Sequence, residues 1–128
     1  KSISKDGGRG SYRGMVSVSP KAENCKLNVV CDALILDDGS QTDTYPTMEV
    51  ANPSARCEHE ASVSKVSDDQ VFYLMSRGIP VMQARSMLIE AFLIGTLSHI
   101  RVPELEKQVE YYIQDWISNS AQMSALDC

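Results

Sequence analysis

The chain has 128 residues, of which 43% are apolar and 23% charged, a composition that supports one packed domain and argues against wholesale disorder. Its formal net charge is −5, and neither half is basic: residues 1–64 carry seven basic and nine acidic side chains, and residues 65–128 carry five and eight. This balance argues against phosphate-backbone binding as the main task, so we expect no nucleic-acid partner.

The sequence also shows no pattern typical of a membrane span or of a secretory signal. The longest uncharged apolar run, Ala91–Ile94, is far too short to span a bilayer, so we expect no membrane partner. Lys1–Gly14 is polar and Gly-rich, unlike a signal peptide. Four cysteines without a C-x-x-C pair fit free thiols in a reducing compartment better than a disulfide framework. We therefore expect a location in the cytoplasm or in a plastid-type organelle.

Residues 1–11 are expected to be a flexible leader, and residues 12–65 show the pattern of short strands joined by tight turns. Short apolar runs alternate there with turn-forming segments such as Asp37–Ser40 and Asn52–Ser54. In Val29–Leu36 the apolar side chains fall on both faces of a strand, which is typical of a covered strand in stacked parallel sheets.

The apolar period changes near residue 66, where a helical pattern begins. Ser67 and Gln70 have the spacing of a capping box at the start of a helix. The first helix should run over about Asp68–Arg77 and end before Gly78, because glycine readily adopts the left-handed conformation that closes a helix.

Two more helices are expected, since Pro80 and Pro103 both suit the first position of a helix. We predict a helical domain over 66–118 and a tail over 119–128. Because the strands of 12–65 come first and the helices follow, the fold class is predicted to be α+β.

The densest group of metal-ligating residue types is Cys57-Glu58-His59-Glu60. On a strand, Cys57 and His59 would share one face, and Glu58 and Glu60 the other. A thiol and an imidazole at this spacing could hold a soft or borderline metal, and the carboxylates could complete an iron site. A charged surface strand would look the same, and a lone cysteine such as Cys31 in an apolar strand is usually a small buried side chain.

An ordered series of segments is more informative than any single motif: Cys31–Leu36, Thr44–Pro46 through Glu49–Val50, Glu58–Lys65 and Asp69–Ile79. These segments resemble the C-terminal region of SufB. The chain is similar to the SufB and SufD family over about residues 12–100; these proteins are the scaffold subunits of the Suf iron–sulfur cluster assembly system.

The resemblance implies a fold and a set of partners. Residues 12–65 would be the last coils of a right-handed parallel β-helix, and the helical domain would dock onto the ATPase SufC. Any ATP turnover would belong to that partner, so the chain itself is not expected to be an enzyme and no catalytic residue is assigned. The remaining expected partners are a SufB or SufD paralogue or a second copy of this chain, and a cysteine desulfurase system as the sulfur source.

The resemblance also implies a site for a transient iron–sulfur cluster. By motif, Cys31 and Glu60 match the cysteine and glutamate of SufB, and Glu58 and His59 belong to the same SufB patch. Cys57 and His59 also match the cysteine and functional histidine of SufD. Cys31 would then accept sulfur, and iron would be held by a set drawn from Cys31, Glu60, His59, Glu58 and Cys57.

The helical end, from Ser76–Ile79 to Ala91-Phe92, reads like SufD, so the chain combines features of both paralogues. This leaves a second interpretation: a SufD-like structural adaptor that does not itself hold the cluster. A mononuclear zinc protein is a third and more distant alternative, because four converging ligands are not evident in the sequence.

Overall fold

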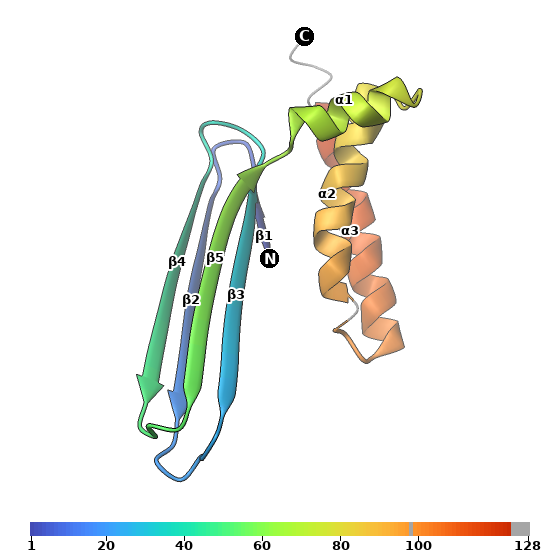
Figure 1. The fold of residues 1–128 in the computed structure, drawn as a ribbon. Helices are drawn as coiled ribbons and strands as arrows, with labels where there is room; N and C mark the ends of the chain where they lie inside the picture. Colours follow the sequence, from blue (N-terminus) through green and yellow to red (C-terminus); the bar gives the residue numbers. More distant parts are fainter. Residues whose placement is uncertain (98, 124–128) are drawn as a thin grey trace. The chain divides into compact units, whose positions relative to one another are not determined.

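The computed structural model describes residues 1–97 and 99–123 of the chain (Figure 1). It divides into two compact units, Lys1–Lys65 and Val66–Cys128, between the strand-rich and helix-rich parts of the sequence. The first unit consists of strands and the second of helices, so the fold class is α+β.

The first unit has two sheets in which every pair of strands is parallel. One sheet has the order β1-β3-β5 and the other the order β2-β4. Their bounds are β1 Ser2–Ser4, β2 Arg9–Val18, β3 Lys26–Ile35, β4 Gln41–Val50 and β5 Arg56–Lys65.

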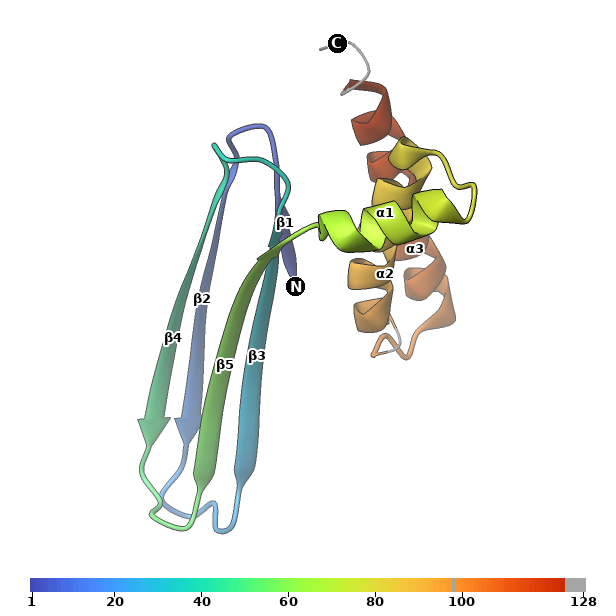
Figure 2. The same cartoon turned by 45° about the horizontal axis from the view of Figure 1, so that its top comes forward.

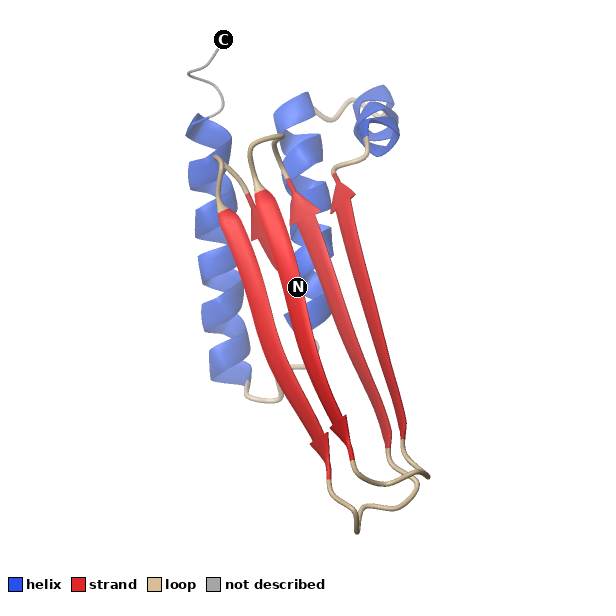
Figure 3. Ribbon diagram, turned by 90° about the vertical axis from the view of Figure 1, so that its left-hand side faces the viewer, coloured by secondary structure: helices blue, strands red, loops and turns tan. Residues whose placement is uncertain are grey.

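Each strand from β3 onward pairs with the strand two places earlier in the chain. Ser2 lies opposite Ala33, Arg9 opposite Gln41 and Lys26 opposite Arg56, so the chain returns to lie beside itself after every second strand. β2 and β4 run in the direction opposite to β3 and β5 (Figures 1, 2 and 3). The chain therefore alternates between the two sheets. Each full pass of the chain contains two strands and adds one strand to each sheet.

The side chain of Ser4 identifies which face of the three-stranded sheet points toward the other sheet. Its Oγ donates a hydrogen bond of 3.0 Å to the carbonyl oxygen of Gln41, the first residue of β4. Ser4 lies opposite Ile35, and parallel partners share a face. Ile35 and, by alternation, the odd-numbered residues of β3 and β5 therefore lie on this inner face.

One end of the strand unit is held by the carboxylate of Asp37. It accepts hydrogen bonds from the Asp6 amide at 2.6 Å, the Gly39 amide at 2.9 Å and the Ser40 hydroxyl at 2.8 Å. The Ser40 bond, followed by the backbone bonds, holds the pKa of Asp37 below its usual value. The expected turn over Asp37–Ser40 is thereby joined to the turn of the preceding pass.

At the opposite end, the buried side chain of Asn52 has the same function. Its Nδ2 donates to the Pro20 carbonyl at 2.8 Å, and its Oδ1 accepts from the amide and the hydroxyl of Ser54 at 2.9 and 2.7 Å. The Ser54 hydroxyl in turn accepts from the Asn24 amide at 2.8 Å. Turns from successive passes of the chain are thus linked at both ends of the strands.

Residues 1–11, expected to form a leader, instead contain β1 and the beginning of β2. A left-handed turn at Asp6 and Gly7, with φ values of 56° and 72°, connects the two strands. Their hydrogen-bond partners lie on β3 and β4, a full pass further along the chain, so a local pattern does not reveal them.

The three predicted helices are confirmed as α1 Asp68–Ser76, α2 Val81–Leu97 and α3 Pro103–Met123. Ser67 Oγ accepts from the Gln70 amide at 3.4 Å, as the capping pattern predicts. At the other end of α1, Gly78 has a φ of +85° and its amide donates to Met75 O at 2.9 Å, which is part of a Schellman closure.

The helical unit buries one or two apolar side chains from each helix, and a hydrogen bond of 2.7 Å from Gln114 to Glu90 links α3 to α2. α3 extends through the first part of the expected tail, and residues 124–128 lie outside the described residues. No helix in the described part of the chain is long and apolar enough to cross a membrane. The buried apolar residues are Val71, Ala84, Leu97 and Ile117.

The Asp37 turn gives a prediction about stability. Replacing Asp37 with Asn should lower the free energy of unfolding at pH 7, because the neutral amide accepts hydrogen bonds from the turn more weakly. The native carboxyl has a lowered pKa, so its contribution to stability is present above the unfolded pKa of about 3.9 and is lost as the pH falls through the lower folded pKa. Urea unfolding followed by circular dichroism at pH 7 and pH 3 should show the difference shrinking in acid.

Asp38→Asn is the matched control, since the neighbouring Asp38 is exposed and pairs with Lys65 at the surface. We expect a smaller effect there. A difference between the Asp37 variant and the native chain that is the same at both pH values would contradict the role of the charge.

Candidate functional site

The register of β3 against β5 decides which candidate side chains lie together. Leu27 lies opposite Cys57, Val29 opposite His59, and Cys31 opposite Ala61. All these positions are odd-numbered, so the side chains of Cys31, Cys57 and His59 lie on the inner face of the sheet. Cys31 and Cys57 are half-buried there, whereas His59 is exposed.

The two glutamates lie on the other face. Glu58 lies opposite Asn28 and Glu60 opposite Val30, and both carboxylates are exposed. Within one chain, therefore, Cys31 and Glu60 do not converge: alternation along the paired strands presents them to opposite sides of the sheet. The alternation predicted for Cys57–Glu60 is confirmed. Which of these side chains share a face with Cys31 depends on the register of β3 against β5.

The inner-face candidates are also spread along the strands. His59 precedes the partner of Cys31 by two positions, which places the two Cα atoms about 8 Å apart at the usual rise and strand spacing. Among the residues that the structure describes, no group of three or more His, Cys, Asp or Glu side chains could hold a metal ion. One copy of the described chain therefore does not present a complete metal site.

The cysteines of the described region are free thiols. Cys25, Cys31 and Cys57 are all half-buried and reduced, and Cys128 lies outside the described residues. Cys25 precedes β3 in a turn.

Asp32, next to Cys31, is a charged group that the sequence did not single out. Its Oδ1 accepts from the Ser62 hydroxyl at 2.6 Å and its Oδ2 from Lys1 Nζ at 3.0 Å. The hydrogen bond from Ser62 contributes most to lowering the pKa of the Asp32 carboxyl, and the contact with Lys1 lowers it further. Ser62 is the parallel partner of Asp32, so this bond also fixes the register next to the thiol.

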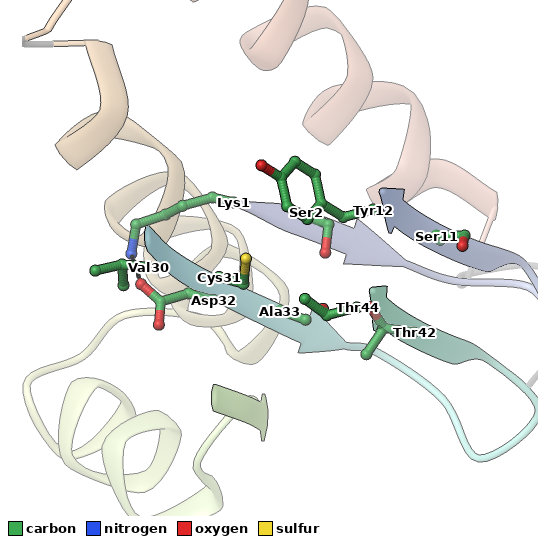
Figure 4. Close-up of a pocket in the computed structure, with 11 residues that line it drawn as sticks. Lys1, Ser2, Ser11, Tyr12, Val30, Cys31, Asp32, Ala33, Thr42 and Thr44 are labelled. Carbon is green, nitrogen blue, oxygen red and sulfur yellow. Dashed lines mark hydrogen bonds and ion pairs between the residues drawn. The ribbon is translucent and has the colours of Figure 1, made fainter. Parts of the chain in front are cut away.

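Cys31 lines a cavity of about 430 Å³ between the two sheets (Figure 4). The sulfur points away from Asp32, toward the side on which Ser2 and Tyr12 lie (Figure 4). Five residues with hydroxyl groups line the cavity: Ser2, Ser11, Tyr12, Thr42 and Thr44. The alternation of β2 and β4 could have indicated the last three, but their proximity to Cys31 depends on the packing of the sheets.

β5 is an edge strand of the described sheet, because it pairs with β3 alone. Its remaining backbone groups are available to another strand, and Val63 on its inner face is 61% exposed. Four of the five residues expected to hold iron lie on this edge strand: Cys57, Glu58, His59 and Glu60.

The chain is similar to known proteins over most of its length. The family model described as the SufBD core domain of SUF system FeS cluster assembly matches residues 1–92, which include the strand unit, α1 and most of α2. A Staphylococcus saprophyticus protein named as an iron–sulfur cluster assembly SufBD family protein is 53% identical over 93 residues. The Bacillus subtilis iron–sulfur cluster assembly protein SufB is 50% identical over the same length.

These alignments cover 73% of this chain and 20% of each relative. The chain thus spans about a fifth of the length of the curated relatives it matches. The family match covers more than two thirds of the chain and contains Cys31 and the whole of β5. The chain therefore belongs to the SufBD family of iron–sulfur cluster assembly proteins.

Proposed function

We propose that this chain is part of a Suf scaffold subunit that receives sulfur and iron, with Cys31 as the sulfur acceptor. The observation that carries the proposal is the position of Cys31 in a chain of this family: a free, half-buried thiol that lines a cavity on the inner face of β3. A thiolate is the reactive form of cysteine, and a partly enclosed cavity limits access by other thiols and oxidants.

Iron would be held by harder ligands on β5. Glu60 and Glu58 offer carboxylate oxygens and His59 an imidazole nitrogen, which suit iron, while Cys31 and Cys57 offer sulfur. Since the carboxylates and the thiols lie on opposite faces of one sheet, a complete ligand set draws on two chains. The iron–sulfur cluster is the cargo of this site, built and then passed on.

The open edge of β5 supports this pairing. An unpaired strand edge adds another strand through backbone hydrogen bonds, and the partner would be a SufB or SufD paralogue or a second copy of this chain. The regular pairing of each strand with the strand two places earlier is the repeat expected of a right-handed parallel β-helix, of which these strands would be the last coils.

The helical unit would bind the SufC-type ATPase, which carries out the ATP turnover, and a cysteine desulfurase system would supply sulfur. In support, α1 lies inside the family match and exposes large apolar side chains, with Phe72 at 72% exposure and Tyr73 and Met75 also exposed. The scaffold would act in the reducing cytoplasm, where free thiols persist.

A SufD-like structural adaptor remains the second candidate. The observation that favours it is the absence of a three-ligand group within the described residues of one chain. Such a subunit would pair through β5 and bind the ATPase without holding the cluster itself. The role of Cys31 distinguishes the two functions.

Replacing Cys31 with Ala should abolish cluster formation in the assembled scaffold, because the acceptor thiol is lost. Folding should change little, since Cys to Ala removes only one sulfur atom from a half-buried position. Anaerobic reconstitution with iron and sulfide, followed by visible absorption spectroscopy, measures the cluster. Cys25→Ala, in the turn before β3, is the control, and native cluster levels in the Cys31 variant would favour the adaptor.

A charge reversal on the helical unit tests the ATPase contact. Arg77→Glu or Arg85→Glu should weaken binding of the SufC-type ATPase about tenfold, as expected for reversing a charge at an interface, and leave cluster reconstitution intact. Lys107→Glu on α3, beyond the family match, is the control. Calorimetric affinities that are equal for all three variants would contradict docking on this surface.

Pairing of two copies can be tested by complementation. A symmetric pair that combines Cys31 of one chain with His59 of the other has two composite sites. Mixing Cys31→Ala chains with His59→Ala chains should then restore part of the reconstituted cluster, because one site in each mixed pair is intact. If mass spectrometry shows mixed pairs but no cluster forms, the partner is a distinct paralogue.

A further inference from the structure

We infer that the hydroxyl groups of Tyr12 and Thr44 position and stabilise the sulfur bound on Cys31 by donating hydrogen bonds to it. The inference rests on the proposed role of Cys31 as the sulfur acceptor. It assigns a role to side chains on β2 and β4, the strands that come directly before and after β3 in the sequence.

The two hydroxyl-bearing residues lie side by side on β2 and β4. Tyr12 lies opposite Thr44 in the parallel register, so the two side chains share a face. That face is the inner one, because a Cβ built on Gly10, two positions before Tyr12, would lie 3.2 Å from Ser4 Oγ and 3.9 Å from Thr42 Oγ1. Tyr12 and Thr44 therefore line the same cavity as Cys31, from the opposite sheet (Figure 4).

Gly14 makes room for the tyrosine on this face. A Cβ built on Gly14 would lie 2.1 Å from the Tyr12 hydroxyl oxygen, so any larger residue there would displace the ring. The ring of Tyr12 is thus accommodated on the inner face of β2 by the missing side chain at position 14.

Both hydroxyls are free to donate. Among the residues that the structure describes, neither the Tyr12 nor the Thr44 hydroxyl is hydrogen-bonded to another protein group. Other hydroxyl groups of the strand unit already donate hydrogen bonds within the protein: Ser4 donates to Gln41 and Ser62 to Asp32. Unpaired donors that share a cavity with a thiol suit an anionic sulfur, since hydrogen bonds to charged acceptors are the stronger ones.

The cavity also has room for the added atom. A water molecule occupies about 30 Å³ in the liquid, so a space of about 430 Å³ accommodates a terminal sulfur together with solvent.

The transfer itself needs no oxidant. The Cys31 thiolate attacks the outer sulfur of a donor persulfide or polysulfide, and a new S–S bond forms at Cys31. The S–S bond of the donor breaks, and the donor leaves as a thiolate or as a polysulfide shorter by one sulfur. The product is a Cys31 persulfide whose terminal sulfur carries the negative charge that the hydroxyls stabilise.

The sequence provides a specific readout, because cleavage after Lys and Arg places Cys31 alone in the peptide Leu27–Arg56, apart from Cys25 and Cys57. The chain is loaded with inorganic polysulfide, freed of excess reagent, and sampled over time by alkylation and mass spectrometry. The half-life of the extra sulfur on Leu27–Arg56 is the measured quantity.

Tyr12→Phe and Thr44→Val should each shorten that half-life by about three- to tenfold, the range expected for loss of one hydrogen bond. Thr44→Ser, which keeps a donor, should restore most of it. Tyr45→Phe and Thr47→Val make the same chemical changes on the outer face of β4 and should have no effect. Circular dichroism shows that each variant retains its strands, and Thr44→Ser keeps the test valid if Thr44→Val fails to fold.

Each outcome decides a separate point. Half-lives of Tyr12→Phe and Thr44→Val equal to that of the native chain would overturn the role of the hydroxyls and leave the proposed function standing. A native chain whose Leu27–Arg56 peptide gains no sulfur would overturn both. If the half-life depends on the two hydroxyls but Cys31→Ala still reconstitutes a normal amount of cluster, the hydroxyls stabilise sulfur on Cys31. That result would overturn the role of Cys31 in cluster assembly.

Discussion

The parallel hydrogen-bonded ladder between β3 and β5 determines the position of every candidate side chain. Its register places Cys31 opposite Ala61 and Val30 opposite Glu60, and strand alternation then separates the thiol from the carboxylate. A slip of one residue would reverse every face of β5 and bring Glu60 to the inner side. Asp32 and Ser62 oppose such a slip, because their hydrogen bond of 2.6 Å joins partners in this register.

The ends of the strands maintain this register with polar side chains. Asp37 and Asn52 each bind backbone or side-chain groups of the preceding pass, at opposite ends of the unit. Successive passes differ slightly in length, so the turns absorb the difference while the strands stay aligned. With the ends fixed in this way, the inner face can carry a thiol and free hydroxyls as well as apolar side chains.

The separation of thiols from carboxylates has a chemical consequence for a scaffold. Sulfur delivered to Cys31 would be held inside, among hydroxyl groups, while Glu58 and Glu60 stay in contact with solvent on the edge strand. In the proposed function, a site that needs both sets would form when a second strand joins β5, which would couple assembly of the scaffold to assembly of the cluster. Under the same proposal a single chain would bind iron weakly by itself, since ligands that do not converge bind a metal weakly.

The sequence alone determined the local features: the cap at Ser67, the closure at Gly78, the turn over Asp37–Ser40 and the alternation in β5. Each depends on residues within a few positions of one another, where propensity and periodicity are informative. Only the tertiary structure decided that residues 1–11 contribute strands, and that Tyr12 and Thr44 share a cavity with Cys31. Those features depend on pairing between strands a full pass apart in the chain, and the register is set by turn lengths and packing that local patterns do not encode.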